Sequence, residues 1–243
     1  MSHPKYTIII TALNESEALQ ETYELVTSNL VGFEYEIILA TSKIATSECI
    51  KRCESIQSLD TRVRVMYQRR KYVAGAILDA IDESLTDSII FMGADGETDP
   101  TVLPSMIAKY ESTNSDVVIA SRWLVADSFI NYDPLKLRFN QAAQLLCRIL
   151  YGRSVTDWTF GYRLYKKSVL NSFEYKELRH PWFLEAILLP VKDGLRIAEV
   201  PVTWKAREIG ESVIRLSDFV GYLRPIFRVR LNPVSKFKKI GAA

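Results

Sequence analysis

A short acidic loop in the middle of the chain carries the residue types best suited to chemistry. The apolar run Ser88–Met92 is typical of a buried strand, and it leads through residues 93–99 to Pro100, which is placed to open a helix. Asp95 and Glu97, two residues apart, can turn their carboxylates toward one point. Such hard oxygen ligands suit Mg²⁺ or Mn²⁺ bound together with substrate phosphates, so the loop predicts a divalent-metal and diphosphate site.

The same loop has a simpler structural interpretation. Asp99 stands directly before Pro100, where an aspartate caps a helix that begins with proline, and the other acids would then only be solvated. From this loop alone, the two interpretations are equally supported.

The elements that must position this loop alternate regularly along the chain. Strands are expected at 6–11, 35–40, 63–67, 88–92 and 116–120, with helices near 19–30, 47–58 and 73–85. The alternation predicts an α/β, Rossmann-like fold with a mainly parallel central sheet, right-handed crossovers and helices on both faces. Ligands of such sheets bind beyond the carboxyl ends of the strands, where the acidic loop falls.

The pattern changes after Ser121-Arg122-Trp123. Residues 137–150 form an amphipathic helical pattern, 161–165 and 197–204 are strand-like, and an aromatic helix is expected near 181–185. A last helix near 216–229 is followed by a run of basic residues. The basic C-terminal segment and the helix at 137–150 suit either docking on an anionic membrane surface or packing on the domain, and both interpretations stay open.

The composition fits one large α/β domain. The chain has 243 residues, of which 48% are hydrophobic and 25% charged, and its net charge of +2 is too small to argue for nucleic acid. The three cysteines lack metal-ligand companions and are expected to be reduced core thiols. Because the chain has neither a signal-peptide pattern nor a run of ~18 apolar residues, we expect it in the cytoplasm, with peripheral contact to the membrane as an option.

The order of motifs along almost the whole chain resembles the GT-A glycosyltransferases of family 2, most closely the dolichyl- or polyprenyl-phosphate hexose synthase branch. The resemblance rests on motifs that follow one another at the family's spacing: Asn14-Glu15, Ala94-Asp95-Gly96, Ser121-Arg122-Trp123, Asp157 through Tyr165, Val200-Pro201 and Gly210-Glu211-Ser212. It implies an inverting transfer of a hexose from a nucleotide-diphosphate sugar, with a divalent cation on the diphosphate. In that branch the acceptor is a lipid phosphate.

The resemblance also implies roles for individual residues. Asp95 matches the second acid of the family's Asp-x-Asp motif and, with Glu97, would hold Mg²⁺ or Mn²⁺. The donor would be bound by a set of residues drawn from several loops: Asn14, Glu15, Ala94, Asp95, Arg207 and Ser212. Arg207 and Ser212 fall in the segment that closes over the donor in the family.

The acceptor side would be served by two arginines and an acid. Arg122 and Arg138 match arginines that face the donor diphosphate and the acceptor phosphate, where a guanidinium fork suits a phosphate. Asp157 sits where inverting relatives place an acid near the acceptor. It would remove a proton from a hydroxyl acceptor, or position groups if the acceptor is already a phosphate anion.

The chain departs from the family pattern at three places, all in the half expected to bind the nucleotide. Gly93 replaces the first acid of the metal motif, Ala40-Thr41-Ser42 replaces acids that read the nucleotide, and Tyr72 and Ala74 stand where relatives carry glycines. Because the core strands and the acceptor half are intact, these departures favour an unusual donor pocket over a damaged fold.

Together these observations predict a single domain, 1–243, with a nucleotide-sugar half at about 6–122, an acceptor half at 123–215 and a basic amphipathic segment at 216–243. The predicted function is metal-dependent hexosyl transfer to a polyprenyl phosphate or a saccharide in cell-surface glycan synthesis. The alternative is a non-catalytic member of the fold that binds a nucleotide sugar or serves as a scaffold. Exposed aromatic helices would permit a homodimer.

Overall fold

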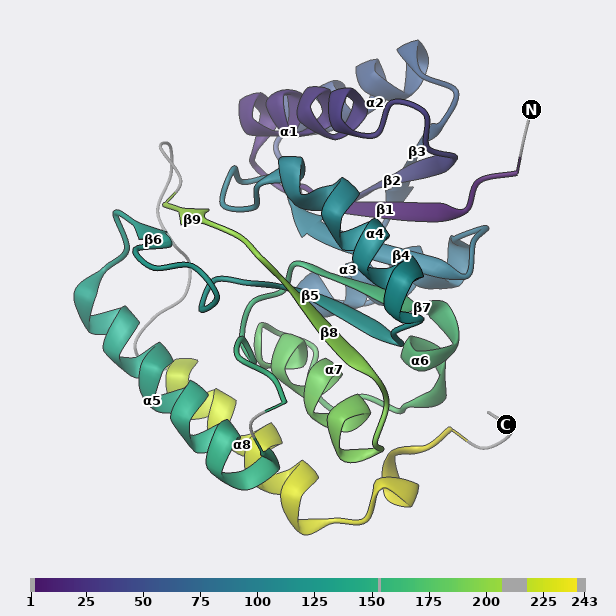
Figure 1. The fold of residues 1–243 in the computed structure, drawn as a ribbon. Helices are drawn as coiled ribbons and strands as arrows, with labels where there is room; N and C mark the ends of the chain where they lie inside the picture. The colour runs from purple at the N-terminus through teal and green to yellow at the C-terminus, as the bar shows by residue number, and fades with distance from the viewer. Residues whose placement is uncertain (1–2, 153, 207–217, 240–243) are drawn as a thin grey trace.

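The computed structural model describes residues 3–152, 154–206 and 218–239, with the backbone alone at 218–220 (Figure 1). Its main sheet has seven strands in the order β3-β2-β1-β4-β7-β5-β8. These strands are β1 (Tyr6–Thr11), β2 (Tyr35–Thr41), β3 (Val63–Tyr67), β4 (Ser88–Gly93), β5 (Val117–Ser121), β7 (Arg163–Lys166) and β8 (Ile197–Pro201). A small second sheet pairs β6 (Phe129–Ile130) with β9 (Trp204–Lys205).

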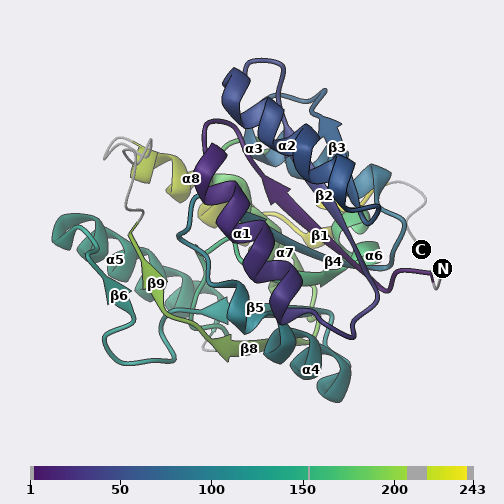
Figure 2. The same cartoon turned by 90° about the horizontal axis from the view of Figure 1, so that it is seen from above.

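The helices connect these strands in the predicted order. They are α1 (Ser16–Asn29), α2 (Ser47–Leu59), α3 (Tyr72–Glu83), α4 (Leu103–Thr113), α5 (Pro134–Tyr151), α6 (Lys167–Ser172), α7 (Pro181–Lys192) and α8 (Asp218–Leu231), with short 3-10 turns η1 (Pro100–Val102) and η2 (Val234–Phe237). Buried residues of α1, α2 and α4 form the core on one face of the sheet, and those of α3 and α7 form the core on the other (Figure 2). The mainly parallel sheet with helices on both faces is therefore confirmed.

Strand β7 is the exception to the parallel arrangement. β1 pairs parallel with β2 and β4, and β5 pairs parallel with β8, but β7 lies antiparallel between β4 and β5. Its first residue, Arg163, pairs with Phe91 in the second half of β4, and its last residue, Lys166, pairs with Ser88 at the start of β4. The chain leaves β5 at the carboxyl edge of the sheet and enters β7 from the same edge. Because no connection returns it to the opposite edge first, β7 runs antiparallel to its neighbours.

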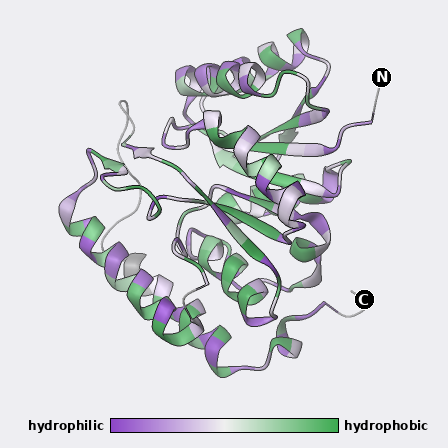
Figure 3. Ribbon diagram, viewed as in Figure 1, coloured by the Kyte–Doolittle hydropathy of each residue, from purple (hydrophilic) through white to green (hydrophobic). Residues whose placement is uncertain are grey.

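The helices α5 and α8 form a further layer beside α7 (Figure 1). Helix α5 begins three residues earlier than predicted, because the Asp133 carboxylate accepts a hydrogen bond from the backbone N–H of Lys136 at 2.7 Å and caps its start. The Tyr151 hydroxyl donates to the Ile226 carbonyl oxygen at 2.6 Å, which ties α5 to α8. Hydrophobic and hydrophilic residues alternate along α5 (Figure 3).

Candidate active site

The acidic loop leaves β4 at the carboxyl edge of the sheet, as predicted. Asp95 Oδ1 accepts a hydrogen bond from the Glu97 backbone N–H at 3.2 Å, and the Ala94 N–H donates to the Thr11 carbonyl oxygen of β1 at 3.1 Å. A Cβ atom on Gly93 would lie 2.9 Å from Asp95 Oδ1. The carboxylate of Asp95 therefore lies over the position from which the side chain of the missing first acid would project.

The carboxylate oxygens of this loop suit a hard divalent cation. Among residues 3–152, 154–206 and 218–239, no group of three or more His, Cys, Asp or Glu residues could hold a metal by itself. Asp95 and Glu97 are both partly exposed, and Mg²⁺ commonly takes one or two carboxylates together with substrate phosphates. The Asp99 carboxylate is used differently, since it accepts from the Thr101 N–H at 2.9 Å and caps η1. The capping interpretation is thus confirmed for Asp99.

The turn after β1 brings Asn14 and Glu15 to the same edge. The Glu15 carboxylate accepts hydrogen bonds from the backbone N–H groups of Leu13 and Asn14, both at 2.8 Å. Glu15 therefore shapes this turn, and its predicted contact with the donor stays a prediction. Arg207 and Ser212 lie outside the described residues.

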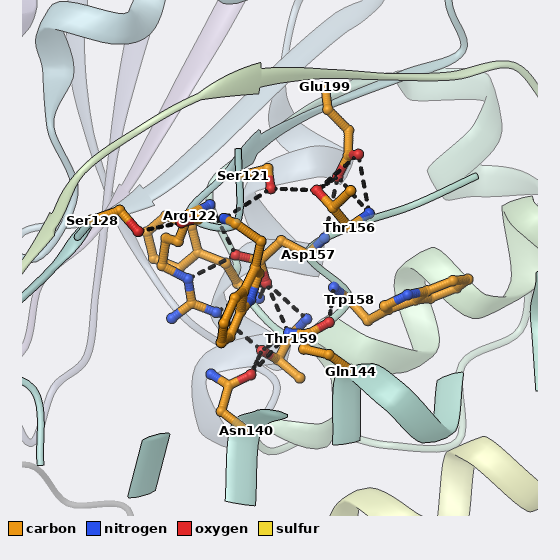
Figure 4. A network of polar contacts seen from close by, with 12 residues as sticks. Ser121, Arg122, Ser128, Asn140, Gln144, Thr156, Asp157, Trp158, Thr159 and Glu199 are labelled. Atoms are coloured by element: carbon orange, nitrogen blue, oxygen red, sulfur yellow. Dashed lines mark hydrogen bonds and ion pairs between the residues drawn. The ribbon is translucent and has the colours of Figure 1, made fainter. Parts of the chain in front are cut away.

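Arg122, directly after β5, forms a buried ion pair with Asp157 (Figure 4). Arg122 Nε donates to Asp157 Oδ2 at 2.7 Å, and Arg122 Nη2 donates to Asp157 Oδ1 at 2.9 Å. Asp157 is 0% exposed and Arg122 is 4% exposed. The guanidinium also lies 4.4 Å from the Phe160 ring centroid and 5.2 Å from that of Phe129. Two charges this deeply buried are retained only because each satisfies the other.

The surroundings of Asp157 favour its ionised form. Burial alone raises the pKa of the Asp157 carboxyl, but attraction and hydrogen bonds from Arg122, together with the Phe160 backbone N–H, lower that pKa below its usual value. Asp157 is therefore a carboxylate with its oxygens occupied and closed off from solvent. In this arrangement it orients Arg122 and is not placed to take a proton from an acceptor. Arg122 Nη1 makes no hydrogen bond to a described residue.

Helix α5 supplies two residues to this network that the sequence analysis missed. Gln144 Nε2 donates to Asn140 Oδ1 at 2.8 Å and to Thr159 Oγ1 at 3.1 Å, and Gln144 Oε1 accepts the Trp158 N–H at 2.8 Å. Both amides are 5% exposed. The signal was present, because two polar residues four apart occupy the buried stripe of an otherwise amphipathic helix.

A second carboxylate supports the loop that carries Asp157. The two oxygens of Glu199, on β8, each lie 3.0 Å from the backbone N–H of Thr156, and Ser121 Oγ lies 2.6 Å from Thr156 Oγ1. Burial raises the pKa of the Glu199 carboxyl, and hydrogen bonds from the Thr156 and Asp157 N–H groups partly offset that increase. Strands β5 and β8 thus hold the loop from both sides.

Arg138 is separate from this buried network. It lies on the exposed side of α5 and makes no hydrogen bond or ion pair with a residue that the structure describes. The structure thus brings Arg122 and Asp157 together and leaves Arg138 at the surface.

The strand order and the acidic loop at the carboxyl edge of the sheet agree with the GT-A fold that the sequence resembles. The sequence profile of Glycosyl transferase family 2 matches residues 7–173, and the chain belongs to this family. Solved structures of similar fold include glucosyl-3-phosphoglycerate synthase from Mycobacterium tuberculosis in complex with Mn²⁺, UDP and glucosyl-3-phosphoglycerate. The TM-score is 0.74 at 16% identity, over 95% of this chain and 81% of the other.

Curated relatives share more sequence. The chain is 26% identical to the dolichol-phosphate mannosyltransferase of Pyrococcus furiosus over 98% of this chain and 68% of that protein. It is 30% identical to the undecaprenyl-phosphate mannosyltransferase of Micrococcus luteus over 52% of each chain. It is 28% identical to the polyprenol monophosphomannose synthase of Mycolicibacterium smegmatis over 62% of this chain and 59% of that protein. The matches therefore span about half to two thirds of the relatives' own lengths.

Proposed function

We propose that this glycosyltransferase moves a hexose from a nucleotide-diphosphate sugar to a polyprenyl phosphate. The observation that carries the proposal is the state of Asp157, whose carboxylate is ionised, buried and bound to Arg122. A hydroxyl acceptor needs a base within reach, whereas a phosphate acceptor is already an anion and needs none. The names of the curated relatives support the same acceptor class.

In the proposed reaction, a phosphate oxygen of the acceptor attacks the anomeric carbon in line. The new bond joins that carbon to the acceptor oxygen, the bond to the diphosphate oxygen breaks, and the configuration inverts. Asp95 and Glu97 would hold a divalent cation, which supplies neutralisation of the charge that develops on the leaving diphosphate. Asp157 keeps the Arg122 guanidinium in one orientation with Nη1 available for a phosphate oxygen, and Arg138 supplies a second cation near the start of α5.

A transfer assay with purified protein tests this function. Short-chain polyprenyl phosphates, the matching polyprenols and free saccharides would be offered with GDP-, UDP- and dTDP-hexoses, with Mn²⁺ or with EDTA. We expect transfer only to the phosphate and only with metal. Transfer to a polyprenol or saccharide would refute the phosphate acceptor. No transfer with any pair, together with metal-independent nucleotide binding, would support the scaffold alternative.

A matched pair of variants in the acidic loop tests the metal ligands. Asp95→Asn should abolish the gain in nucleotide affinity that Mn²⁺ gives. Asp99→Asn should not, because asparagine also caps helix starts and Asp99 serves that role. Equal losses in both variants would contradict the assignment of Asp95 as a metal ligand.

We also propose that α5 and α8 rest on the membrane that holds the acceptor. Large apolar side chains are exposed on both helices: Leu135, Phe139, Leu145 and Ile149 on α5, and Leu223, Phe227 and Leu231 on α8. Within the described residues, no helix is long and apolar enough to cross a bilayer.

A pair of surface variants tests this contact with the membrane. Ile149 is 69% exposed, so Ile149→Asp should reduce sedimentation with anionic vesicles. Leu59→Asp, at an 84% exposed position on α2, should not.

A further inference from the structure

The start of α3 adopts a backbone conformation that its sequence does not favour. Tyr72, the first residue of α3, has φ 66°, in the left-handed region that costs free energy for any residue with a side chain. Its side chain is 43% exposed, so burial of the ring does not compensate for that cost. Strain of this kind persists where neighbouring structure holds the residue in place.

The ring of Tyr72 lies against Arg179, in the segment before α7. The guanidinium carbon of Arg179 lies 4.0 Å from the centroid of the Tyr72 ring, and the Ala74 N–H donates to the Leu178 carbonyl oxygen at 3.3 Å. A cation over an aromatic face is attracted by the ring, and this contact uses none of the guanidinium N–H donors. Tyr72 therefore orients Arg179 without occupying its hydrogen-bonding capacity.

The packing of α7 places its first turn beside β4, the strand that leads to the acidic loop. The ring of Phe183 lies 6.1 Å from that of Phe91, and the ring of Trp182 lies 5.5 Å from it. Phe91 is on β4, two residues before Gly93. The starts of α3 and α7 thus meet at the carboxyl edge of the sheet, on the side of β4 from which the Asp95 loop continues.

Arginines of the domain differ in whether their guanidinium N–H groups are already paired. Arg122 Nε and Nη2 are committed to Asp157, and Arg69 and Arg70 pair with the Asp79 carboxylate. Arg179 is exposed, and its guanidinium makes no hydrogen bond or ion pair with any residue in the part of the chain that the structure describes. A guanidinium that is oriented, charged and unpaired suits a bidentate contact with a phosphate.

We propose that Arg179, held by Tyr72, binds a phosphate group of a substrate during glycosyl transfer. The proposal rests on the proposed function, because it needs phosphate-bearing substrates at this edge of the sheet. The phosphate belongs either to the nucleotide-diphosphate donor or to the polyprenyl-phosphate acceptor. In both cases Arg179 is a substrate-binding residue and Tyr72 is a positioning residue.

Two measurements separate the sources of the phosphate. The dissociation constants of UDP and GDP with Mn²⁺ report the donor, and the KM of a short-chain polyprenyl phosphate reports the acceptor. We expect Arg179→Ala to weaken one of them by about 10- to 100-fold, with partial recovery in Arg179→Lys. Arg196→Ala is the charge-matched control, since Arg196 lies 3.6 Å from Asp116 at the opposite edge of the sheet and should change neither constant.

The variant Tyr72→Gly tests the positioning role. Glycine adopts φ 66° without strain, so the melting temperature should be unchanged or higher, while substrate binding should weaken as it does in Arg179→Ala. If Tyr72 had only a structural role, Tyr72→Gly would not weaken substrate binding while the melting temperature is kept. Wild-type affinity for both substrates in Arg179→Ala would overturn the proposal. If the wild-type protein itself binds neither substrate, the proposed function fails, and this inference fails with it.

Discussion

Removing the charge of Asp157 should destabilise the fold strongly. Asp157→Asn leaves the Arg122 guanidinium buried with no counter-ion, because both residues are almost fully enclosed and the pair is joined at 2.7 and 2.9 Å. Breaking one partner of a buried pair costs about 3–5 kcal/mol. For a domain of this size, about 2–4 °C is lost per kcal/mol, so the melting temperature should fall by roughly 6–20 °C. Much of the stability typical of a domain would be lost.

A second variant separates the buried charge from the lost hydrogen bonds. In Arg122→Met with Asp157→Asn, no charge remains, and the asparagine oxygen can still accept the Phe160 N–H. We expect the double variant to be more stable than Asp157→Asn by about 1–3 kcal/mol. Urea unfolding followed by tryptophan fluorescence is suitable, since Trp158 is 0% exposed beside the pair. A loss below about 1 kcal/mol in Asp157→Asn, or strictly additive losses in the double variant, would refute this reasoning.

Three further outcomes follow from the same structure. Because the pKa of Asp157 is lowered in the folded state, its contribution is complete above about pH 4 and is lost as the pH falls further, so the unfolding midpoints of wild type and Asp157→Asn should converge in acid. Gly93→Ala should displace the Asp95 carboxylate, 2.9 Å from the new Cβ, and reduce the Mn²⁺-dependent gain in nucleotide affinity by about tenfold with little change in melting temperature. Arg228→Met should cost about 1–3 kcal/mol in urea unfolding, because it leaves the Glu185 carboxylate, 0% exposed, without its cation at 2.8 Å.

The fold was largely accessible from the sequence because its signals are local. Runs of β-branched residues predicted β1 to β5 to within a residue or two, and Pro100 with Asp99 marked the start of the next helix. The direction and place of β7 could not be predicted, since they depend on the path of the chain between β5 and Arg163. That path is set by tertiary packing of α5 and not by the pattern of residues 161–165.

Contacts within one loop could be predicted from the sequence, whereas contacts between distant side chains could not. Asp95 and Glu97 could be placed together because two positions separate them. The bond between Arg122 and Asp157 joins residues 35 positions apart, and no spacing rule predicts it. The stack of Tyr72 on Arg179 likewise depends on how the starts of two helices pack, so only the departure at Tyr72 was visible beforehand.

The position of β7 has a consequence for how the chain can be divided. Strand β4, which leads into the acidic loop, pairs with β1 on one side and with β7, residues 163–166, on the other. Strand β5 pairs with the same β7. A fragment ending near residue 122 would leave both strands with exposed hydrogen-bonding edges, which favours aggregation. We therefore expect residues 6–122 and the segment that carries β7 to unfold together, because β7 completes the sheet between β4 and β5.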